Sequence, residues 1–302
     1  MITLRQLNLC NPGELYQVQV LHNTLFPGMN ASTAWMKWFF NDASKRAYGA
    51  FDGDLLIGLW CVEPKRLLLS DGRVSQVGRC FAVGIHPSYR RQNLFVELSQ
   101  WAICVERDIA EFDYILGFPQ HGRPVVGGHL KAGWQFVQSI SLRALEPQPT
   151  DVCLAMCDTT RTFDFARARK NEVPGSFQET ERELTKRWLK HPHNFYIILS
   201  AGIENYIVLK QYGDVMHVLD LHGSLKQANK LLRATSELAC CHRARTVTMW
   251  CADNDPFVFE ATEAGFRPIA EGSIDMLAVN VRERSPLVLP ESHFQMGGEE
   301  SY

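Results

Sequence analysis

VGIHPSYRRQNLF, residues 83–95, joins the end of an apolar strand-like run to the start of an amphipathic helix through a short basic turn. The apolar run covers residues 74–85, and from Asn93 onward apolar residues recur at helical spacing. The first amides of a helix have no partner within it, the helix dipole adds positive potential, and Arg90 and Arg91 add charge and donors. A strand, a basic turn and a helix N-terminus in this order predict a seat for a pyrophosphate.

On both sides of this turn, the first half of the chain alternates strand and helix patterns. Runs of β-branched and aromatic residues bounded by polar turns predict strands, and apolar residues three or four positions apart predict helices. Asp52-Gly53-Asp54 is a short polar turn of the hairpin kind. We expect strands at residues 2–9, 47–51, 55–62, 74–85, 114–118 and 134–142, and helices at 13–25, 33–40, 93–109 and 125–132.

The second half repeats this order of elements. We expect strands at residues 195–199, 205–210, 215–221 and 246–251, helices at 225–241 and 256–264, and an extended run from residue 266. The two halves also share an ending, Lys-Ala-Gly-Trp at 131–134 and Glu-Ala-Gly-Phe at 263–266. The Pro-containing segment 146–150 breaks any regular element. We therefore predict a first domain at 1–146, a second domain at 151–280 and an irregular tail at 281–302.

Composition narrows the class of protein. The 302 residues are 46% hydrophobic and 21% charged, as in a globular protein, and a net charge of −2 gives no general attraction to nucleic acid or anionic lipid. The first residues lack a secretory signal pattern, and no apolar run reaches membrane-spanning length. The nine cysteines and the pairs at 191–193 and 240–242 lack the spacing of metal ligands. We expect a cytoplasmic protein with no metal and no nucleic-acid or membrane partner.

The basic turn resembles the central signature of the GNAT superfamily of acyl-CoA N-acyltransferases. That signature is an Arg or Gln, two residues, a Gly, one residue and a Gly or Ala, after a strand ending in an apolar residue, any residue and Pro. Arg90, Asn93 and Phe95 stand at the three signature positions, after residues 85–87. Asn accepts a positive φ more readily than most residues, whereas Phe95 is bulkier than the family's small side chain. The resemblance implies an α/β (α+β) fold of two GNAT-like lobes, each with a mixed, mostly antiparallel central sheet flanked by helices.

Residues downstream of the turn extend the resemblance in the correct order. Residues 114–118 resemble the family's fifth strand, which splays from the fourth and leaves a slot for pantetheine, and Gln120 falls near a common Asn. Residues 129–134 are similar to the family's ending, and His129 stands where a Tyr commonly protonates the departing thiolate. Glu63 is the nearest candidate for the general base, a role that the family often gives to an acidic residue near the central strands.

The resemblance also implies the ligands and the residues that hold them. The co-substrate is acetyl-CoA or another acyl-CoA. An aromatic pair, Trp35 and Trp38, lies where the family's variable helices form the wall of the acceptor site, although such residues are more often core aromatics. The expected cofactor-binding residues are Val83, Ile85, Arg90, Arg91, Gln92, Asn93, Leu94, Phe95 and Gln120.

The implied activity is transfer of an acetyl or other short acyl group to a primary amine of a small metabolite, of the amino sugar or amino acid type. We expect a monomer or homodimer in which the second lobe is non-catalytic, because residues 220–226 lack an Arg cluster. Two alternatives stay open. One is a degenerate GNAT protein that binds acyl-CoA or a partner without chemistry, as Asn93 and Phe95 indicate. The other is a lysine acetyltransferase.

Overall fold

The computed structural model describes residues 1–40, 44–149, 157–160, 162–165, 175–191, 194–270, 272–282, 286–289 and 293. The first half of the chain forms six strands and four α-helices, close to the predicted ranges. The strands are β1 (Ile2–Gln6), β2 (Arg46–Asp52), β3 (Leu55–Leu68), β4 (Val74–Ile85), β5 (Tyr114–Gly117) and β6 (Gln135–Leu145). The helices are α1 (Pro12–Leu25), α2 (Thr33–Phe40), the single 3₁₀ turn η1 (Pro87–Tyr89), α3 (Leu94–Ile109) and α4 (Pro124–Lys131).

The second half confirms the predicted repeat of element order. Its strands are β7 (Asp158–Thr160), β8 (Ile197–Ser200), β9 (Tyr206–Tyr212), β10 (Val215–His222), β11 (Thr246–Ala252), β12 (Arg267–Pro268) and β13 (Ile274–Asn280). Its helices are α6 (Glu181–Leu184), the π-helical turn η3 (Thr185–Leu189), α7 (Leu225–Cys241) and α8 (Val258–Glu263). The shared endings also match in geometry, because Gly133 and Gly265 leave their helices with φ of 96° and 103°.

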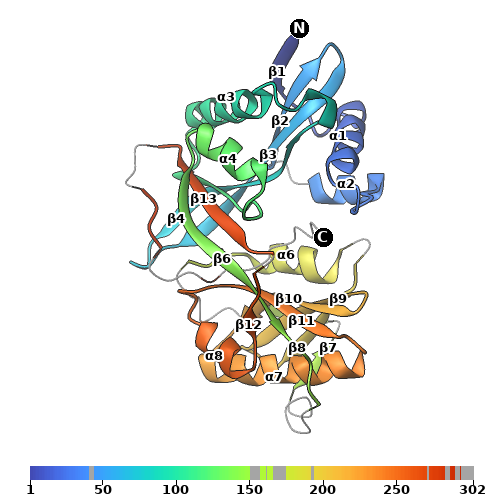
Figure 1. Ribbon diagram of the computed structural model, residues 1–302, viewed down its shortest axis with the longest axis vertical. Helices are drawn as coiled ribbons and strands as arrows, with labels where there is room; N and C mark the ends of the chain where they lie inside the picture. Colours follow the sequence, from blue (N-terminus) through green and yellow to red (C-terminus); the bar gives the residue numbers. More distant parts are fainter. Residues whose placement is uncertain are drawn as a thin grey trace.

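One sheet runs through both lobes, and its strands are exchanged between them. The order is β1-β2-β3-β4-β5-β13-β6-β11-β10-β9-β8-β7 (Figure 1). β13 lies between β5 and β6, although it comes from the end of the described chain. β6 pairs with β13 through residues 135–140 and with β11 through residues 140–145, so this one strand crosses from the first lobe into the second. The predicted domain limits assign residues 274–280 to the second domain, whereas these residues complete the sheet of the first lobe.

Helices cover both faces of the first lobe's sheet. α3 packs on one face, where Trp60, Val62 and Cys80 belong to the same core cluster as its residues Leu94 and Leu98. α1 and α2 pack on the other face with Cys61 and Phe81 as neighbours in the core. Adjacent strand residues thus point to opposite faces, as the period of a strand requires. β13 adds Leu277 and Val279 to the α3 cluster, so the last described strand is part of the first lobe's core.

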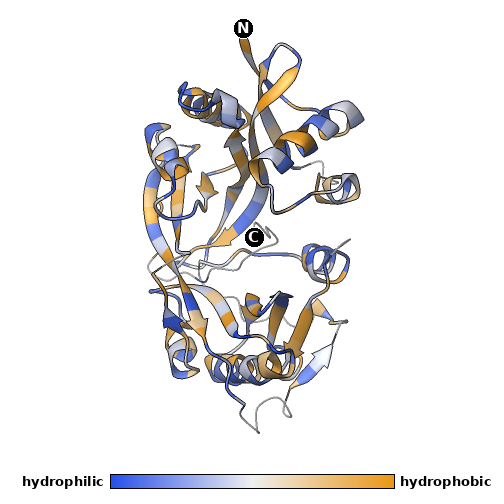
Figure 2. Cartoon of the chain, turned by 45° about the vertical axis from the view of Figure 1, so that its right-hand side comes forward, coloured by the Kyte–Doolittle hydropathy of each residue, from blue (hydrophilic) through white to orange (hydrophobic). Residues whose placement is uncertain are grey.

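The second lobe has the same layered construction. α7 and α8 bury Leu231, Leu238 and Ala261 against one face of β9, β10 and β11. On the other face, Trp188 of η3 packs with Tyr206 of β9. Figure 2 shows orange and blue alternating along the surface helices, the amphipathic pattern that buries one side of each helix.

The sequence pattern did not predict every element, and β3 and α6 are examples. β3 extends beyond the predicted residue 62 to Leu68 and pairs with β4 to its end. The prediction ended too early because the charged residues Glu63, Lys65 and Arg66 interrupt the apolar pattern. α6 was not expected, although Thr180 and Glu183 form a capping box at its start. The prolines at 147 and 149 follow the end of β6 as predicted, while Thr150 and most of the predicted tail lie outside the described residues.

Candidate functional site

The basic turn at the end of β4 has the geometry of an anion seat. Arg91 and Asn93 both adopt the left-handed conformation, with φ of 65° and 63°, so Asn93 takes the positive φ expected of it. α3 begins at the next residue, and the first amides of a helix point outward without a helical partner. Arg90 and Arg91 are exposed, and Nε of Arg90 donates to the carbonyl oxygen of Ile85 at 3.1 Å. The turn thus combines helix amides with two arginines, which suits a pyrophosphate.

β4 and β5 part beside this turn, as the resemblance predicts. The two parallel strands pair only from Val77 to Arg79 on β4, and Arg79 opposite Leu116 is the last pair. The register of β4 against β3 also shifts between Leu59 and Cys61, close to Ala82, whose φ is 48°. Beyond Arg79, β4 therefore diverges from β5 toward the basic turn, while β5 continues alongside β13.

Phe95 and His129 meet between α3 and α4. Their ring centroids are 5.1 Å apart, and His129 also lies 4.5 Å from the ring of Trp134. A Cβ added to Gly128 would come within 2.7 Å of Phe95, so the glycine makes room for the bulky ring. His129 is only 3% exposed, and burial lowers its pKa to about 4. This position favours a packing role, and the proton-donor role inferred from the resemblance stays a prediction.

A second histidine, which the sequence analysis did not select, lies beside a buried carboxylate. His121 lies between β5 and α4, and its Nδ1 is 3.0 Å and 3.1 Å from the two carboxylate oxygens of Asp275. Asp275 is 3% exposed and also accepts a hydrogen bond from Oγ of Ser139 at 3.0 Å. A carboxylate only accepts, so Nδ1 carries hydrogen and Nε2 is left to exchange a proton. Asp275 stands on β13, far along the sequence, so no local motif could reveal the pair.

Gln120, the neighbour of His121, is also at the edge of this region. Its backbone forms an isolated bridge with Ile274, and its side-chain oxygen accepts from Nε of Arg123 at 3.1 Å. The predicted residues from Val83 to Phe95, together with Gln120, thus lie on the strand ends, turn and loops around the separation of β4 and β5. Val83 and Phe95 are half-buried and Ile85 and Leu94 are buried, so these four support the turn, whereas Gln92 and Asn93 are exposed on it.

A cavity of about 330 Å³ lies on the other side of the sheet, between α2, β3, β4 and α6. Arg79 of β4 faces into it, and Arg79 pairs in register with Glu63 of β3. These residues share the face of Cys61 and Phe81, which pack under α1 and α2, and not the face of α3. Figure 1 shows α6 on the α2 side of the first lobe, which is the side opposite α3 and α4.

The two predicted wall tryptophans have different positions. Trp38 lines the cavity and makes an edge contact with His191 at 4.5 Å between ring centroids. Trp35 instead stacks on Phe39 at 4.7 Å within the core of α1 and α2. Trp38 is therefore placed to contact a ligand, and Trp35 supports the helix that carries it.

Glu63 lies in the cavity but in the wrong surroundings for a general base. Its carboxylate is 3.1 Å from Nζ of Lys45 and 3.8 Å from Nζ of Lys65, and it also forms an ion pair with Arg79. Burial on its own would raise the pKa of Glu63, but Arg79, Lys45 and Lys65 hold it well below its usual range. A carboxylate stabilised by three cations gives little driving force for accepting a proton. The ion network around Glu63 disfavours the base role, which stays a prediction.

The second lobe repeats this arrangement of two parting parallel strands, but its own residues occupy the place where they part. β10 and β11 pair in parallel only through residues 215–218 and 246–249, as β4 and β5 do in the first lobe. His293 bridges the two strand ends: its Nδ1 is 2.9 Å from Asp255 and its Nε2 is 2.8 Å from the carbonyl oxygen of Leu221. The amide of Ser224, at the start of α7, donates to the side chain of Asn205 at 3.0 Å. Side chains of the second lobe thus form hydrogen bonds at the positions that correspond to the anion seat of the first lobe.

Across the described ranges, no group of three His, Cys, Asp or Glu side chains could hold a metal ion, while His193 lies outside them. No helix in the part of the chain that the structure describes has the length and hydropathy needed to span a membrane.

Comparison with known proteins identifies the fold. No protein-family model matches the sequence, and no curated protein matches it. Among solved structures, a GCN5-related N-acetyltransferase from Kribbella flavida has a TM-score of 0.65 at 16% identity, over 92% of this chain and 71% of that chain. A tandem GNAT protein from the clavulanic acid biosynthesis pathway has a TM-score of 0.62 at 11% identity, over 94% and 100%. A GCN5-related N-acetyltransferase from Sphaerobacter thermophilus has 0.58 at 11%, over 96% and 98%. The chain therefore has the fold of the GNAT N-acetyltransferases, in the tandem arrangement.

Proposed function

We propose that this protein is an N-acyltransferase that moves an acetyl or other short acyl group from acyl-CoA to a primary amine of a small metabolite. One observation carries the proposal: β4 and β5 part after Arg79 and Leu116, between an anion seat and a cavity on opposite sides of the sheet. A donor and an acceptor bound on the two sides would meet where the strands separate. Holding two reactants in this way is the main contribution that a protein makes to acyl transfer.

The donor side fits acyl-CoA, which supplies an acyl group activated as a thioester. Arg90, Arg91 and the first amides of α3 would hold its pyrophosphate, because the turn presents them together at the end of β4. Beyond Arg79, the edge of β4 no longer pairs with β5 and is left to form hydrogen bonds with an extended ligand.

His121 is the residue that we place at the proton transfer. Asp275 orients the ring through Nδ1, so that Nε2 can take up a proton and pass it to the departing sulfur. The ring is at the end of β5, where the strands part, and its side chain is 66% exposed. His129 is the alternative donor, and it is buried against Phe95 and Trp134.

The acceptor amine would lie in the cavity against Trp38, with residues of α6 and η3 closing it from the second half of the chain. A small amine, such as an amino acid or an amino sugar, suits a cavity of this size. The test is release of free thiol from acetyl-CoA and longer acyl-CoAs in the presence of a panel of amines. Acyl transfer to small amines supports the proposal, and labelling of proteins alone would favour a lysine acetyltransferase.

Phe95 favours a second candidate function, acyl-CoA binding without transfer. Its ring fills the space between α3 and α4 and requires a glycine at position 128. If the ring blocks the thioester end of acyl-CoA, binding would persist without turnover. Phe95→Ala distinguishes the two: turnover that appears only in this variant identifies a degenerate enzyme, and turnover in the parent chain excludes one.

A further inference from the structure

The cavity beside β3 and β4 is far more basic than the rest of the molecule. Cationic and carboxylate side chains both line it within the described part of the chain, and cations outnumber carboxylates there. The cations are Lys45, Lys65, Arg66, Arg79, Lys186 and Arg187, and the carboxylates are Glu63 and Glu183. The whole chain carries a net charge of −2, so this concentration of positive charge is local.

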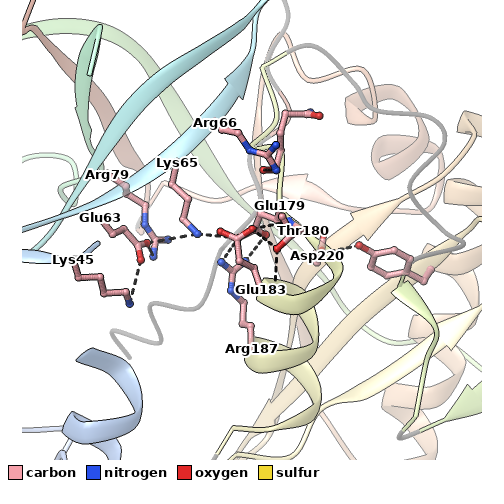
Figure 3. A network of polar contacts seen from close by, with 12 residues as sticks. Lys45, Glu63, Lys65, Arg66, Arg79, Glu179, Thr180, Glu183, Arg187 and Asp220 are labelled. Atoms are coloured by element: carbon pink, nitrogen blue, oxygen red, sulfur yellow. Dashed lines mark hydrogen bonds and ion pairs between the residues drawn. The ribbon is translucent and has the colours of Figure 1, made fainter. Parts of the chain in front are cut away.

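The cations in the floor of the cavity share a small number of carboxylates. Glu63 is the common partner of Lys45, Lys65 and Arg79. Figure 3 shows Glu63, Lys65 and Arg79 on β3 and β4, with Lys45 just before β2. They face a second group in the turn before α6 and on η3.

The second group is centred on Glu179, which is 2% exposed at its side chain. Nζ of Lys65 lies 3.0 Å from Glu179, and both terminal nitrogens of Arg187 donate to the same carboxylate, one of them at 2.6 Å (Figure 3). Each lysine or arginine of the two groups is at most 10% exposed at its side chain. Glu183 is occupied elsewhere, because it accepts from the amide and hydroxyl of Thr180 in the capping box.

Buried positive charge in excess of its partners is costly, because the protein interior replaces the water that would solvate it. Among the described residues, four buried cations, Lys45, Lys65, Arg79 and Arg187, are arranged around the buried carboxylates of Glu63 and Glu179, and the buried Asp220 carboxylate also acts on Arg187. Arg66 stands at the rim, where it donates to the carbonyl oxygen of Gln178 at 3.1 Å and keeps further donors for a ligand. A bound anion would complete the charge balance and accept hydrogen bonds from several of these donors at once.

We propose that the cavity binds the acceptor through a carboxylate or phosphate group, so that the acceptor is an amine that also carries negative charge. The identification of this ligand as the acceptor rests on the proposed acyl transfer, whereas the binding of an anion does not. A lysine-rich peptide or an amine with several positive charges is excluded by the same cations, because like charges repel at these distances. The volume of about 330 Å³ suits a small metabolite.

The same charges would prepare the amine for reaction. Burial lowers the pKa of Lys45, and Lys65 and Arg79 lower it further against the opposing effect of Glu63. An ammonium group bound beside these residues would lose its proton more readily for the same reason. The neutral amine is the nucleophile, so a basic cavity would favour its formation by loss of a proton to solvent, without a dedicated general base.

Binding of small amines in the absence of acyl-CoA tests the anion site directly. Glycine and glycinamide differ by a carboxylate, and O-phosphoethanolamine and ethanolamine differ by a phosphate. Calorimetric titration of the full chain should show binding of the anionic member of at least one pair, weakened by added salt. The member that binds identifies the group. Equal binding within both pairs, or no binding of either anion at millimolar concentration, would overturn the proposal.

Variants that change the charge of the cavity provide a second test of the anion site. Arg66→Gln should weaken binding of the preferred anion roughly tenfold, because it removes one charge-assisted hydrogen bond. Arg73→Gln is the matched control: Arg73 is 76% exposed at its side chain, pairs with Asp71 on the β3–β4 loop and should leave binding unchanged. Glu63→Gln should instead strengthen binding, because it removes negative charge from the cavity. If Arg66→Gln and Arg73→Gln have the same effect, the cavity is not the binding site.

Turnover separates this proposal from the proposed function. Acyl transfer to the anionic member of a pair, at a higher kcat/KM than to its neutral partner, supports both. Transfer that prefers glycinamide or ethanolamine would keep the enzyme and overturn the anionic acceptor. Anion binding that is sensitive to Arg66→Gln, with no transfer to any amine, would keep the anion site and overturn the acyltransferase.

Discussion

Nδ1 of His121 lies 3.0 Å from Oδ1 of Asp275, which joins the loop after β5 to a strand 154 positions further along the chain. The contact exists because β13 pairs with β5 and β6, which brings Asp275 beside Ser139 and under the loop. A buried carboxylate that orients a histidine is the arrangement used for proton transfer in many unrelated enzymes. The exchange of β13 into the first lobe therefore links the two halves of the chain at the proposed reaction centre.

The first prediction concerns this pair. His121→Phe should lower kcat by about 10²–10⁴-fold while leaving acyl-CoA binding nearly intact, because proton transfer acts in the transition state. Asp275→Asn should lower kcat with little change in acyl-CoA binding, because the amide of asparagine can donate to Nδ1 and hold the ring in the wrong tautomer. Steady-state kinetics across pH measures both effects. A uniform loss at all pH values in Asp275→Asn, matched by weaker acyl-CoA binding, would indicate a structural role alone.

The second prediction concerns His129, whose burial lowers its pKa to about 4. In the unfolded chain the His129 ring takes up a proton below pH about 6.5, whereas in the folded state it stays neutral. The contribution of His129 therefore lowers the free energy of unfolding as the pH falls from 6.5 toward 4. The difference between pH 6.5 and pH 4 corresponds to at most about 3.4 kcal/mol. Urea unfolding at pH 7 and pH 5 should show a smaller acid loss in His129→Phe than in the parent. If kcat of His129→Phe also falls strongly, the donor role is His129's and not His121's.

The third prediction concerns the basic turn. Acetyl-CoA should raise the Tm of the parent chain, because it binds the folded state, and the double change of Arg90 and Arg91 to Ala should remove most of that rise. Arg73→Ala serves as the control for loss of an exposed arginine outside the turn. Differential scanning fluorimetry with and without millimolar acetyl-CoA is sufficient. An unchanged rise in the double variant would move the pyrophosphate to another site.

The fourth prediction concerns His293 in the second lobe. Burial on its own would lower the pKa of His293, but the Asp255 carboxylate raises it above its usual value. A raised pKa means that the stabilisation is fully present below pH about 6.5 and is lost as the pH rises through the folded-state value. His293→Ala should therefore destabilise the protein more at pH 6 than at pH 9, by roughly 1–3 kcal/mol at the lower pH. Equal destabilisation at both pH values would show that packing against Phe257, not charge, holds the residue.

The fifth prediction concerns truncation at the boundary predicted from sequence. A fragment of residues 1–149 lacks β13, so the edges of β5 and β6 lose their partner and the α3 core loses Leu277 and Val279. We expect this fragment to be unfolded or aggregated by circular dichroism and gel filtration. A soluble, cooperatively unfolding fragment would show that the strand exchange is dispensable.

Local patterns determined most of the elements. The apolar run that ends at Ile85 and the helical spacing from Leu94 predict β4, the turn and α3 almost to the residue, because each signal lies within one element. The positive φ of Asn93 and the shared Gly endings at 133 and 265 can also be predicted from the sequence, since they depend on each residue's own backbone preferences. The basic turn as a candidate anion seat follows from these alone.

Only the tertiary structure decided which strands pair and which side chains meet. β13 is an ordinary apolar strand whose sequence does not record that it lies between β5 and β6, because strand pairing is set by long-range packing. The partner of His121 and the cations that surround Glu63 and Glu179 follow from that pairing and from the position of α6. From the sequence, the charged residues Glu63, Lys65 and Arg66 indicate only the end of a strand. They form the floor of a cavity because the second half of the chain packs over them.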